Sequence, residues 1–391
     1  MKRKLLFAAL LLTLAATAVA TPYGPPNPDL LTMRKYPTQR REMVLPKVKG
    51  FTVLTGDFHV HTMYSDGVAT PEMRVDEAWF DGIDVLAITD HESHRHGKNY
   101  LQYVAKYFPD GKAPKYQSRM KNISPDDFDK IPVDLNQSVR EAQKRAEKYG
   151  MIIVPGIEIT RNPSKIGHYN ALFTKDNNTI IDKDVTKSIE NARAQKALIM
   201  HNHPWWRTKT TDKNELHKKL YAAGLIDGVE VVNGVTFAPK MVRRCVEENL
   251  FMATGTDIHG ISNVNATDKY RTMTFLMTKQ HSLKGVRQAI EKHRTLCYVR
   301  GQIIGSEQWL GEFFKACVQL KPVAATDKSV TYALTNVSSL EFKVHLPGDS
   351  KQYTISPFRT VQFSVAKGEA LQLTVDNMWH MDEQHPTFTL K

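Results

Sequence analysis

The sequence contains few cysteines, and none of them lies close to another. Its 391 residues include only Cys245, Cys297 and Cys317, and no Cys-x-x-Cys pair is present. This count excludes a small fold built on disulfide bonds, and the odd number leaves at least one thiol unpaired. We expect buried, inert cysteines and no thiolate chemistry.

Acidic residues are fewer than basic ones, 41 against 53, so the formal net charge is +12. A basic chain is weak evidence for nucleic-acid or phosphate partners, and a solvated cationic surface explains it equally well. Hydrophobic residues make up 41% and charged residues 24% of the chain, which is a globular composition. It excludes wholesale disorder, a collagen-like fibre and a polytopic membrane protein.

The N-terminus has the pattern of a targeting segment. Lys2, Arg3 and Lys4 precede an apolar run over residues 5–17, and Ala-Val-Ala follows at 18–20. The run is shorter than the ~20 residues that a membrane-spanning helix needs. We therefore expect residues 1–20 to be a cleaved signal peptide, with no stable membrane span after cleavage and a periplasmic or secreted mature protein. An uncleaved membrane anchor is the alternative.

Three further regions follow. Residues 21–50 are rich in proline, which predicts an extended arm. Residues 51–305 alternate short apolar runs with helical patterns, which predicts an α/β fold with a parallel sheet closed into a barrel. If residues 169–173 form an extra strand, about seven βα units remain, so the barrel is distorted from the eightfold form.

The pattern changes near the C-terminus. Short strands separated by turns are predicted from residue 330 onwards, without any helical pattern. Residues 318–391 are therefore expected to form a small antiparallel β-sandwich domain, with its boundary between residues 300 and 322.

Metal-ligating residue types gather where five predicted strands end. Residues two apart on a strand share a face, so His59 and His61 project together. Glu158, flanked by two isoleucines, needs a partner for its buried charge. Loops at the carboxyl ends of barrel strands converge, which predicts a metal site there. The five strand ends carry His59, His61 and Asp66; Asp90 and His91; Glu158; His201 and His203; and Asp257 and His259.

Two of these strand ends leave a choice of ligand. We expect His91 to be a ligand and Asp90 to support a neighbouring ligand, for example by accepting a histidine N–H. His201 is either an alternative to His203 or a residue that lines the pocket.

This motif set resembles that of the PHP superfamily, the polymerase and histidinol phosphatase domains. The resemblance spans roughly residues 57–259 and implies a distorted (β/α)7 barrel with a trinuclear metal centre that hydrolyses phosphoesters. The matching motifs are His59-x-His61 with Ser65-Asp66-Gly67, Thr89-Asp90-His91, Glu158, His203-Pro204 and Asp257-x-His259.

The resemblance also implies three ligand sets. The first ion would be held by His59, His61, Glu158 and Asp257. Glu158 would bridge to a second ion, which His168 and His203 also hold. The third ion would be bound by Asp66, His91 and His259.

Imidazole and carboxylate ligands suit three divalent ions of zinc, manganese or iron. A hydroxide between two metals would attack phosphorus, with Glu158 bridging and Asp257 or a pocket histidine such as His201 handling protons. Arg161, Lys165 and Asn233 are candidate substrate-binding residues. Trp205 and Trp206 would either stack on a substrate or pack against an insertion that begins at residue 94 and could form a lid.

The predicted signal peptide argues against polymerase-associated and histidinol phosphatase members. The sequence resembles exported bacterial phosphodiesterases acting on organophosphate diesters, so we expect a phosphodiesterase for small phosphoester substrates. The alternatives are a nuclease, a broad phosphomonoesterase, a related hydrolase of C–N bonds, and a non-catalytic binding protein. A nucleic-acid partner is not favoured, and the complete ligand set argues against pure binding.

Overall fold

The computed structural model describes residues 39–92, 134–161, 166–262 and 269–390. The predicted signal peptide, most of the proline-rich arm, Lys165 and nearly all of the insertion from residue 94 lie outside these ranges. Within the described ranges, every helix is too short or too polar to cross a membrane.

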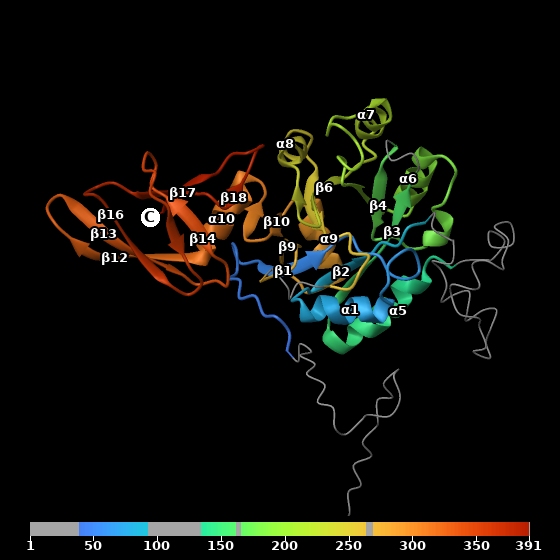
Figure 1. The fold of residues 1–391 in the computed structure, drawn as a ribbon, viewed down its shortest axis with the longest axis horizontal. Helices are drawn as coiled ribbons and strands as arrows, with labels where there is room; N and C mark the ends of the chain where they lie inside the picture. The colour runs from blue at the N-terminus through green and yellow to red at the C-terminus, as the bar shows by residue number, and fades with distance from the viewer. Residues whose placement is uncertain (1–38, 93–133, 162–165, 263–268, 391) are drawn as a thin grey trace, which may run out of the picture. The chain divides into compact units, whose positions relative to one another are not determined.

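The main sheet is mixed and has 12 strands, which curl into a half-barrel (Figure 1). Its strands pair in the order β18-β11-β10-β9-β1-β2-β3-β4-β5-β6-β7, and β8 pairs with β6. They are β1 (Thr52–Asp57), β2 (Val85–Ile88), β3 (Ile152–Thr160), β4 (His168–Leu172), β5 (Leu198–Asn202), β6 (Gly228–Asn233), β7 (Thr236–Phe237), β8 (Phe251–Gly255), β9 (Met273–Thr278), β10 (Thr295–Val299), β11 (Gln302–Ile304) and β18 (Met378–Trp379).

The sheet confirms the predicted α/β class and distorted barrel, with one correction. Parallel pairing holds for β1-β2-β3 and for β5-β6-β8, but β4 is antiparallel to both of its neighbours, and β9 is antiparallel to β1. Apolar runs that are buried on both faces, such as β2, do not encode strand direction. The predicted parallel direction was therefore wrong for β9, and β4, which was expected as an extra strand, is also antiparallel.

The helices begin where the sequence offers caps. The Thr70 hydroxyl accepts a hydrogen bond from the Met73 N–H, and Pro71 occupies the first turn of α1. Helix α5 is an exception, because its N-cap residue Asn136 makes no side-chain cap hydrogen bond. The helices that accompany the main sheet are α1 (Pro71–Phe80), α5 (Gln137–Ala146), α6 (Val185–Ala194), α7 (Glu215–Ala222), α8 (Pro239–Glu247) and α9 (Leu283–Glu291), with 3-10 turns at Glu147–Tyr149 and Asn177–Thr179.

The C-terminal region forms two small antiparallel sheets, ordered β12-β13-β16 and β15-β14-β17-β19. The sequence analysis did not predict α10 and β12, which lie in and beside the uncertain boundary, or β10 and β11 before it. These elements and the other strands of the region are α10 (Glu307–Cys317), β12 (Val318–Ala325), β13 (Ser329–Asn336), β14 (Phe342–His345), β15 (Tyr353–Ile355), β16 (Thr360–Ala366), β17 (Leu371–Val375) and β19 (Thr387–Leu390).

One hydrophobic core runs from the main sheet through α10 into the C-terminal sheets. On one side Phe313 of α10 stacks on Phe275 of β9, with ring centroids 5.4 Å apart. On the other side Phe314 packs edge-on against Phe342 of β14 at 5.1 Å. All three cysteines are free and buried, as predicted.

Candidate metal centre and active site

The curl of the sheet brings the chain after β1 beside the chain after β8. The Asp257 N–H donates to the His59 carbonyl at 2.8 Å, and the His61 N–H donates to the Ile258 carbonyl at 3.2 Å. These backbone bonds place the His59–His61 pair against the Asp257–His259 pair. Residues almost 200 positions apart in the sequence therefore share one site.

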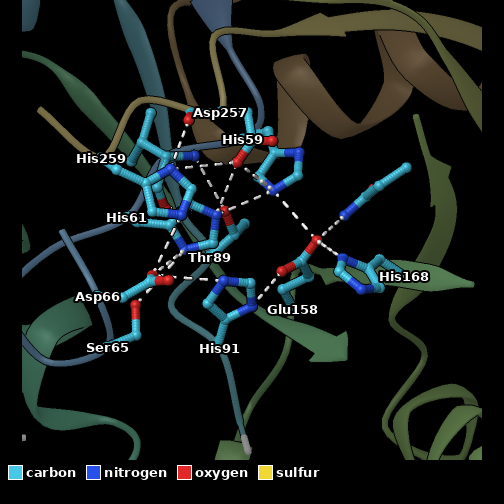
Figure 2. A network of polar contacts seen from close by, with 12 residues as sticks. His59, His61, Ser65, Asp66, Thr89, His91, Glu158, His168, Asp257 and His259 are labelled. Atoms are coloured by element: carbon cyan, nitrogen blue, oxygen red, sulfur yellow. Dashed lines mark hydrogen bonds and ion pairs between the residues drawn. The ribbon is translucent and has the colours of Figure 1, made fainter. Parts of the chain in front are cut away.

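His59, His61 and Asp257 point their ligand atoms at one another (Figure 2). The Nε2 atoms of the two imidazoles lie 3.1 Å apart. Oδ1 of Asp257 is 3.4 Å from Nε2 of His59 and 3.0 Å from Nε2 of His61. Two ring nitrogens this close cannot both carry a proton towards each other, so the arrangement suits lone pairs that converge on a cation.

Glu158 lies at the centre of the cluster and is fully buried. Its Oε1 is 3.2 Å from Nε2 of His59, 3.4 Å from Nδ1 of His168 and 3.7 Å from Nε2 of His203. Its Oε2 pairs with Nδ1 of His91 (Figure 2). A carboxylate with imidazoles around both oxygens is placed to bridge two ions.

A separate group of ligand atoms surrounds Asp66. Its Oδ1 lies 3.3 Å from Nε2 of His91 and 3.2 Å from Nε2 of His259, while Nδ1 of His61 is 3.8 Å away. Ligand atoms of these four residues all lie within 4.8 Å of one another. The set therefore has the size and composition of one ion site.

The electrostatics of the cluster fit bound divalent cations. Burial opposes a charge on His59, but the carboxylates of Asp257, Glu230 and Glu158 outweigh it and raise the pKa of His59 well above its usual value. Burial and the neighbouring His91 lower the pKa of His61 to about 3. Nε2 of His168 is buried and has no hydrogen-bond partner among the described residues. Protons alone cannot pair with all the imidazole lone pairs and carboxylate charges of this cluster. Divalent metal ions would bind them.

The sequence analysis missed Glu230, a fully buried acid on β6. Its Oε1 lies 3.1 Å from Nδ1 of His59, and its Oε2 accepts the backbone N–H of His203 at 2.8 Å. Its ligand atoms also group with those of His59 and His203. The only signal in the sequence was a charged residue inside the apolar run of residues 228–232.

Asp90 supports the site differently from the prediction. Its Oδ1 accepts the Thr62 N–H and the Ser65 hydroxyl, each at 2.7 Å, and its Oδ2 accepts the Thr62 hydroxyl at 2.8 Å. No histidine N–H is bound to it in the described structure. The aspartate therefore fixes the loop that carries Asp66 and does not orient an imidazole.

Two buried amides and a hydroxyl hold Glu158 in place, and the sequence analysis missed all three. Asn202 donates to Oε1 of Glu158 and to Oδ1 of Asn170, both at 2.8 Å. Asn170 in turn donates to the Phe58 carbonyl at 3.0 Å. Thr160 donates to Oε2 of Glu158 at 3.0 Å. These bonds fix the central carboxylate from β3, β4 and β5.

Asn233, predicted to bind substrate, lies at the site with its amide already engaged. Its Nδ2 donates to Oδ2 of Asp257 at 3.2 Å and to Oε2 of Glu230 at 3.1 Å. In the structure Asn233 therefore fixes the carboxylates of Asp257 and Glu230 relative to each other.

The structure places His203, but not His201, in the ligand cluster. Asn202 faces Glu158, so the adjacent strand residue His201 faces the other way. Its ring stacks on Tyr169 at 4.9 Å, and its Nδ1 lies 3.0 Å from the Tyr221 hydroxyl. His203 follows the strand with φ of 27°, which breaks the alternation. The geometry does not support the catalytic role predicted for His201.

Arg161 also faces away from the cluster. Its guanidinium donates to the Thr160 carbonyl, the Asp182 carbonyl and the Ser188 hydroxyl, and it forms an ion pair with Glu92. These contacts tie it to the N-terminal end of α6, so the predicted substrate contact is not supported. Lys165 lies outside the described residues.

Comparisons with known proteins identify the family of this chain. The PHP domain family model matches residues 57–248. A crystal structure of a two-domain protein from Bacteroides vulgatus, containing a predicted PHP-like metal-dependent phosphoesterase, is 30% identical. The match covers 90% of this chain and 99% of that chain, with a TM-score of 0.77.

Two more distant structures resemble the fold weakly and carry no functional argument. A putative metal-dependent phosphoesterase from Bifidobacterium adolescentis is 17% identical over 60% of this chain and 94% of its own, with a TM-score of 0.38. A lesion-specific endonuclease from Pyrococcus furiosus is 15% identical over 65% of this chain and 59% of its own, with a TM-score of 0.37. A search of curated proteins found no significant match. The chain belongs to the PHP family and is a PHP-like metal-dependent phosphoesterase.

Proposed function

We propose that the protein is an exported phosphodiesterase that hydrolyses small organophosphate diesters at a centre of three divalent ions, whether zinc, manganese or iron. The observation that carries this proposal is the set of overlapping ligand groups that share His59, His61 and His203. Three ions placed in these groups would use every ligand that the sequence analysis assigned. Export rests on the pattern of residues 1–20 alone, and N-terminal sequencing of the mature protein tests it.

The charge of the site favours a diester over a monoester. Three divalent ions bring six positive charges, of which Asp66, Glu158, Asp257 and Glu230 offset four and a hydroxide one more. The remaining charge of about one matches the single negative charge of a diester better than the two of a monoester. Arg74 and Arg161 lie near the cluster, but each donates its hydrogen bonds to acceptors of the protein and not towards a substrate.

The chain's own side chains would orient the reaction. When bound, the divalent ions would acidify a water molecule as the nucleophile and neutralise the phosphoryl oxygens. Glu158, fixed by Asn202 and Thr160, would hold two ligand sets at a constant separation. Asp257 is held by Asn233, is partly exposed and lies 3.0 Å from Nε2 of His61, so we assign proton transfer to its carboxylate.

A hydrolysis panel on metal-reconstituted protein tests the proposal. It compares a monoester, a diester, a cyclic nucleotide and single-stranded DNA, and the diester should give the highest kcat/KM. Glu158→Ala should abolish turnover, because it removes the carboxylate that all three imidazole neighbours of Oε1 share. Glu247→Ala, which alters an exposed side chain on α8, is the matched control.

Three outcomes would contradict the proposal. A preference for DNA with a steep salt dependence would favour the nuclease alternative. A preference for the monoester would reverse the charge argument. Full activity in chelator-treated protein would exclude the metal centre as the source of catalysis.

A further inference from the structure

The loop that follows His203 carries an exposed aromatic ring next to the ligand cluster. Trp206 is 39% exposed, although it is a large apolar side chain. Its ring centroid lies 5.1 Å from that of His168 and 5.6 Å from that of His203. Its backbone N–H donates to the His203 carbonyl at 2.8 Å, so the ring is fixed to the ligand segment itself. Trp206 therefore forms part of the rim above the ions that Glu158 would bridge.

A guanidinium lies on this ring. The Cζ atom of Arg207 is 4.3 Å from the centroid of the Trp206 ring, within the range of a cation–π contact. Arg207 has φ of 53°, a left-handed backbone conformation that few residues other than glycine adopt. The guanidinium of Arg207 is therefore held on the Trp206 ring, although the side chain is exposed.

Arg207 differs from the other arginines around the cluster. Arg74, Arg161 and Arg271 each donate to carbonyl or carboxylate groups of the protein. Within the described part of the chain, no hydrogen bond or ion pair engages the guanidinium of Arg207. An arginine presents five N–H donors in a planar fork that matches phosphate oxygens. Here the fork lies on Trp206, whose ring contacts His168 and His203, and no hydrogen bond within the described residues engages its donors.

We infer that Arg207, held on Trp206, is a substrate-binding residue that binds an anionic phosphate oxygen of the phosphoester. This inference rests on the proposed function. It assigns to Arg207 the positively charged, substrate-binding side chain that the sequence analysis sought in Arg161 and Lys165. The oxygen belongs either to the scissile phosphoryl group or to a second phosphate on the ester arm. Both sources offer the same chemistry to the guanidinium.

Two matched diesters separate these sources: thymidine 5′-(p-nitrophenyl phosphate) and the same compound with a 3′-phosphate. They share the scissile bond and the leaving group, so they differ only in the second phosphate. Arg207→Gln should raise KM about tenfold, the size expected for a charge-assisted hydrogen bond at a partly exposed position, with little change in kcat. An effect on both substrates assigns the scissile phosphoryl group, and an effect on the 3′-phosphorylated substrate alone assigns the second phosphate.

Two further variants separate binding from bulk charge and from folding. Lys209→Gln removes one positive charge from an exposed position of the same loop and should leave KM within about twofold, because screening weakens charges that make no direct contact. Trp206→Leu should raise KM in the same direction as Arg207→Gln, since it removes the surface that holds the guanidinium. Unchanged thermal unfolding of each variant would show that folding is intact.

Calorimetric binding of thymidine 3′,5′-bisphosphate to the metal-loaded protein gives a readout independent of turnover. Arg207→Gln should weaken this binding about tenfold, and Lys209→Gln should not. The inference is wrong if Arg207→Gln leaves both KM values and the Kd unchanged, or if Lys209→Gln has an equal effect. If the wild-type protein hydrolyses neither diester, the proposed function fails, and the calorimetric comparison still decides the role of Arg207.

Discussion

Oε1 of Glu230 lies 3.1 Å from Nδ1 of His59, whereas Nε2 of the same ring faces His61 and Glu158. With a metal ion bound, the carboxylate would accept the proton of Nδ1 and leave the lone pair of Nε2 for the ion. Such partners of metal-binding histidines fix the tautomer and increase the basicity of the ligand. Glu230 also accepts the N–H of His203, so one buried acid orients two candidate ligands.

Glu230→Gln should weaken metal binding by about 10–100-fold, because the neutral amide accepts a weaker hydrogen bond from His59 and leaves its tautomer unspecified. Metal content after dialysis against a series of buffered free-metal concentrations measures this change. Glu247→Gln, on the exposed side of α8, serves as the control. An unaltered metal-binding curve would show that neither the charge of Glu230 nor its hydrogen bond to His59 contributes to metal binding.

Asp66→Ala should remove one metal ion and leave the other two. Asp66 belongs to the ligand group of His61, His91 and His259, which contains neither Glu158 nor His168, so the loss of its carboxylate should leave those two ligands in place. Elemental analysis should find about three ions per chain in the wild-type protein and about two in the variant. Equal metal content in both proteins would mean that this group is not an ion site.

Asp57→Ala should destabilise the fold by about 3–5 kcal/mol. Asp57 accepts two hydrogen bonds from the buried guanidinium of Arg271, at 3.1 and 2.7 Å, and its removal leaves that charge with a weaker partner. Urea unfolding of the wild-type and variant proteins measures the difference in free energy. Glu215→Ala, which breaks an exposed pair with Lys218, should leave the urea midpoint close to that of the wild-type protein.

The contact between α1 and α5 should depend on pH in the acid range. Burial opposes ionisation of Asp76, but hydrogen bonds from Arg145 at 2.6 and 2.7 Å and from Tyr149 at 2.9 Å outweigh it and hold the pKa of Asp76 below its ordinary 3.8. A lowered carboxyl pKa stabilises the folded state above the unfolded pKa, and this stability disappears as the pH falls through the folded value.

Asp76→Asn should therefore be less stable than the wild-type protein by about 1 kcal/mol at pH 7, and the difference should shrink below pH ~4. Urea midpoints of both proteins from pH 7 to pH 3 test this expectation, since the shared metal site cancels in the comparison. A difference that stays constant down to pH 3 would show that the Asp76 carboxylate contributes through packing and not through its charge.

The sequence predicted the parts of the site that obey strand periodicity. His59 and His61 share a face because they are two residues apart, and the curl of the sheet brings them to Asp257. His201 and His203 have the same spacing, but the positive φ of His203 turns only that side chain into the cluster. Spacing alone could not distinguish these two cases.

The missed residues share a different cause. Glu230, Asn170 and Asn202 lie on buried strands, and their roles depend on which strand lies beside which. That information is long-range, as is the antiparallel direction of β4, which places Asn170 opposite Met200 and next to Asn202. Arg161 was misplaced for a related reason, because the partners of its guanidinium come from residues 182 and 188.

The pairing of β18 with β11 has a practical consequence for dissecting the chain. Met378 and Trp379 come from the last 14 residues, yet they complete the edge of the sheet that carries the ligands, and α10 presents phenylalanines to both halves. A fragment that stops after α10 would present a bare strand edge and uncovered aromatic rings, and it should aggregate. Assays of catalysis by this chain therefore require the polypeptide through its final strand.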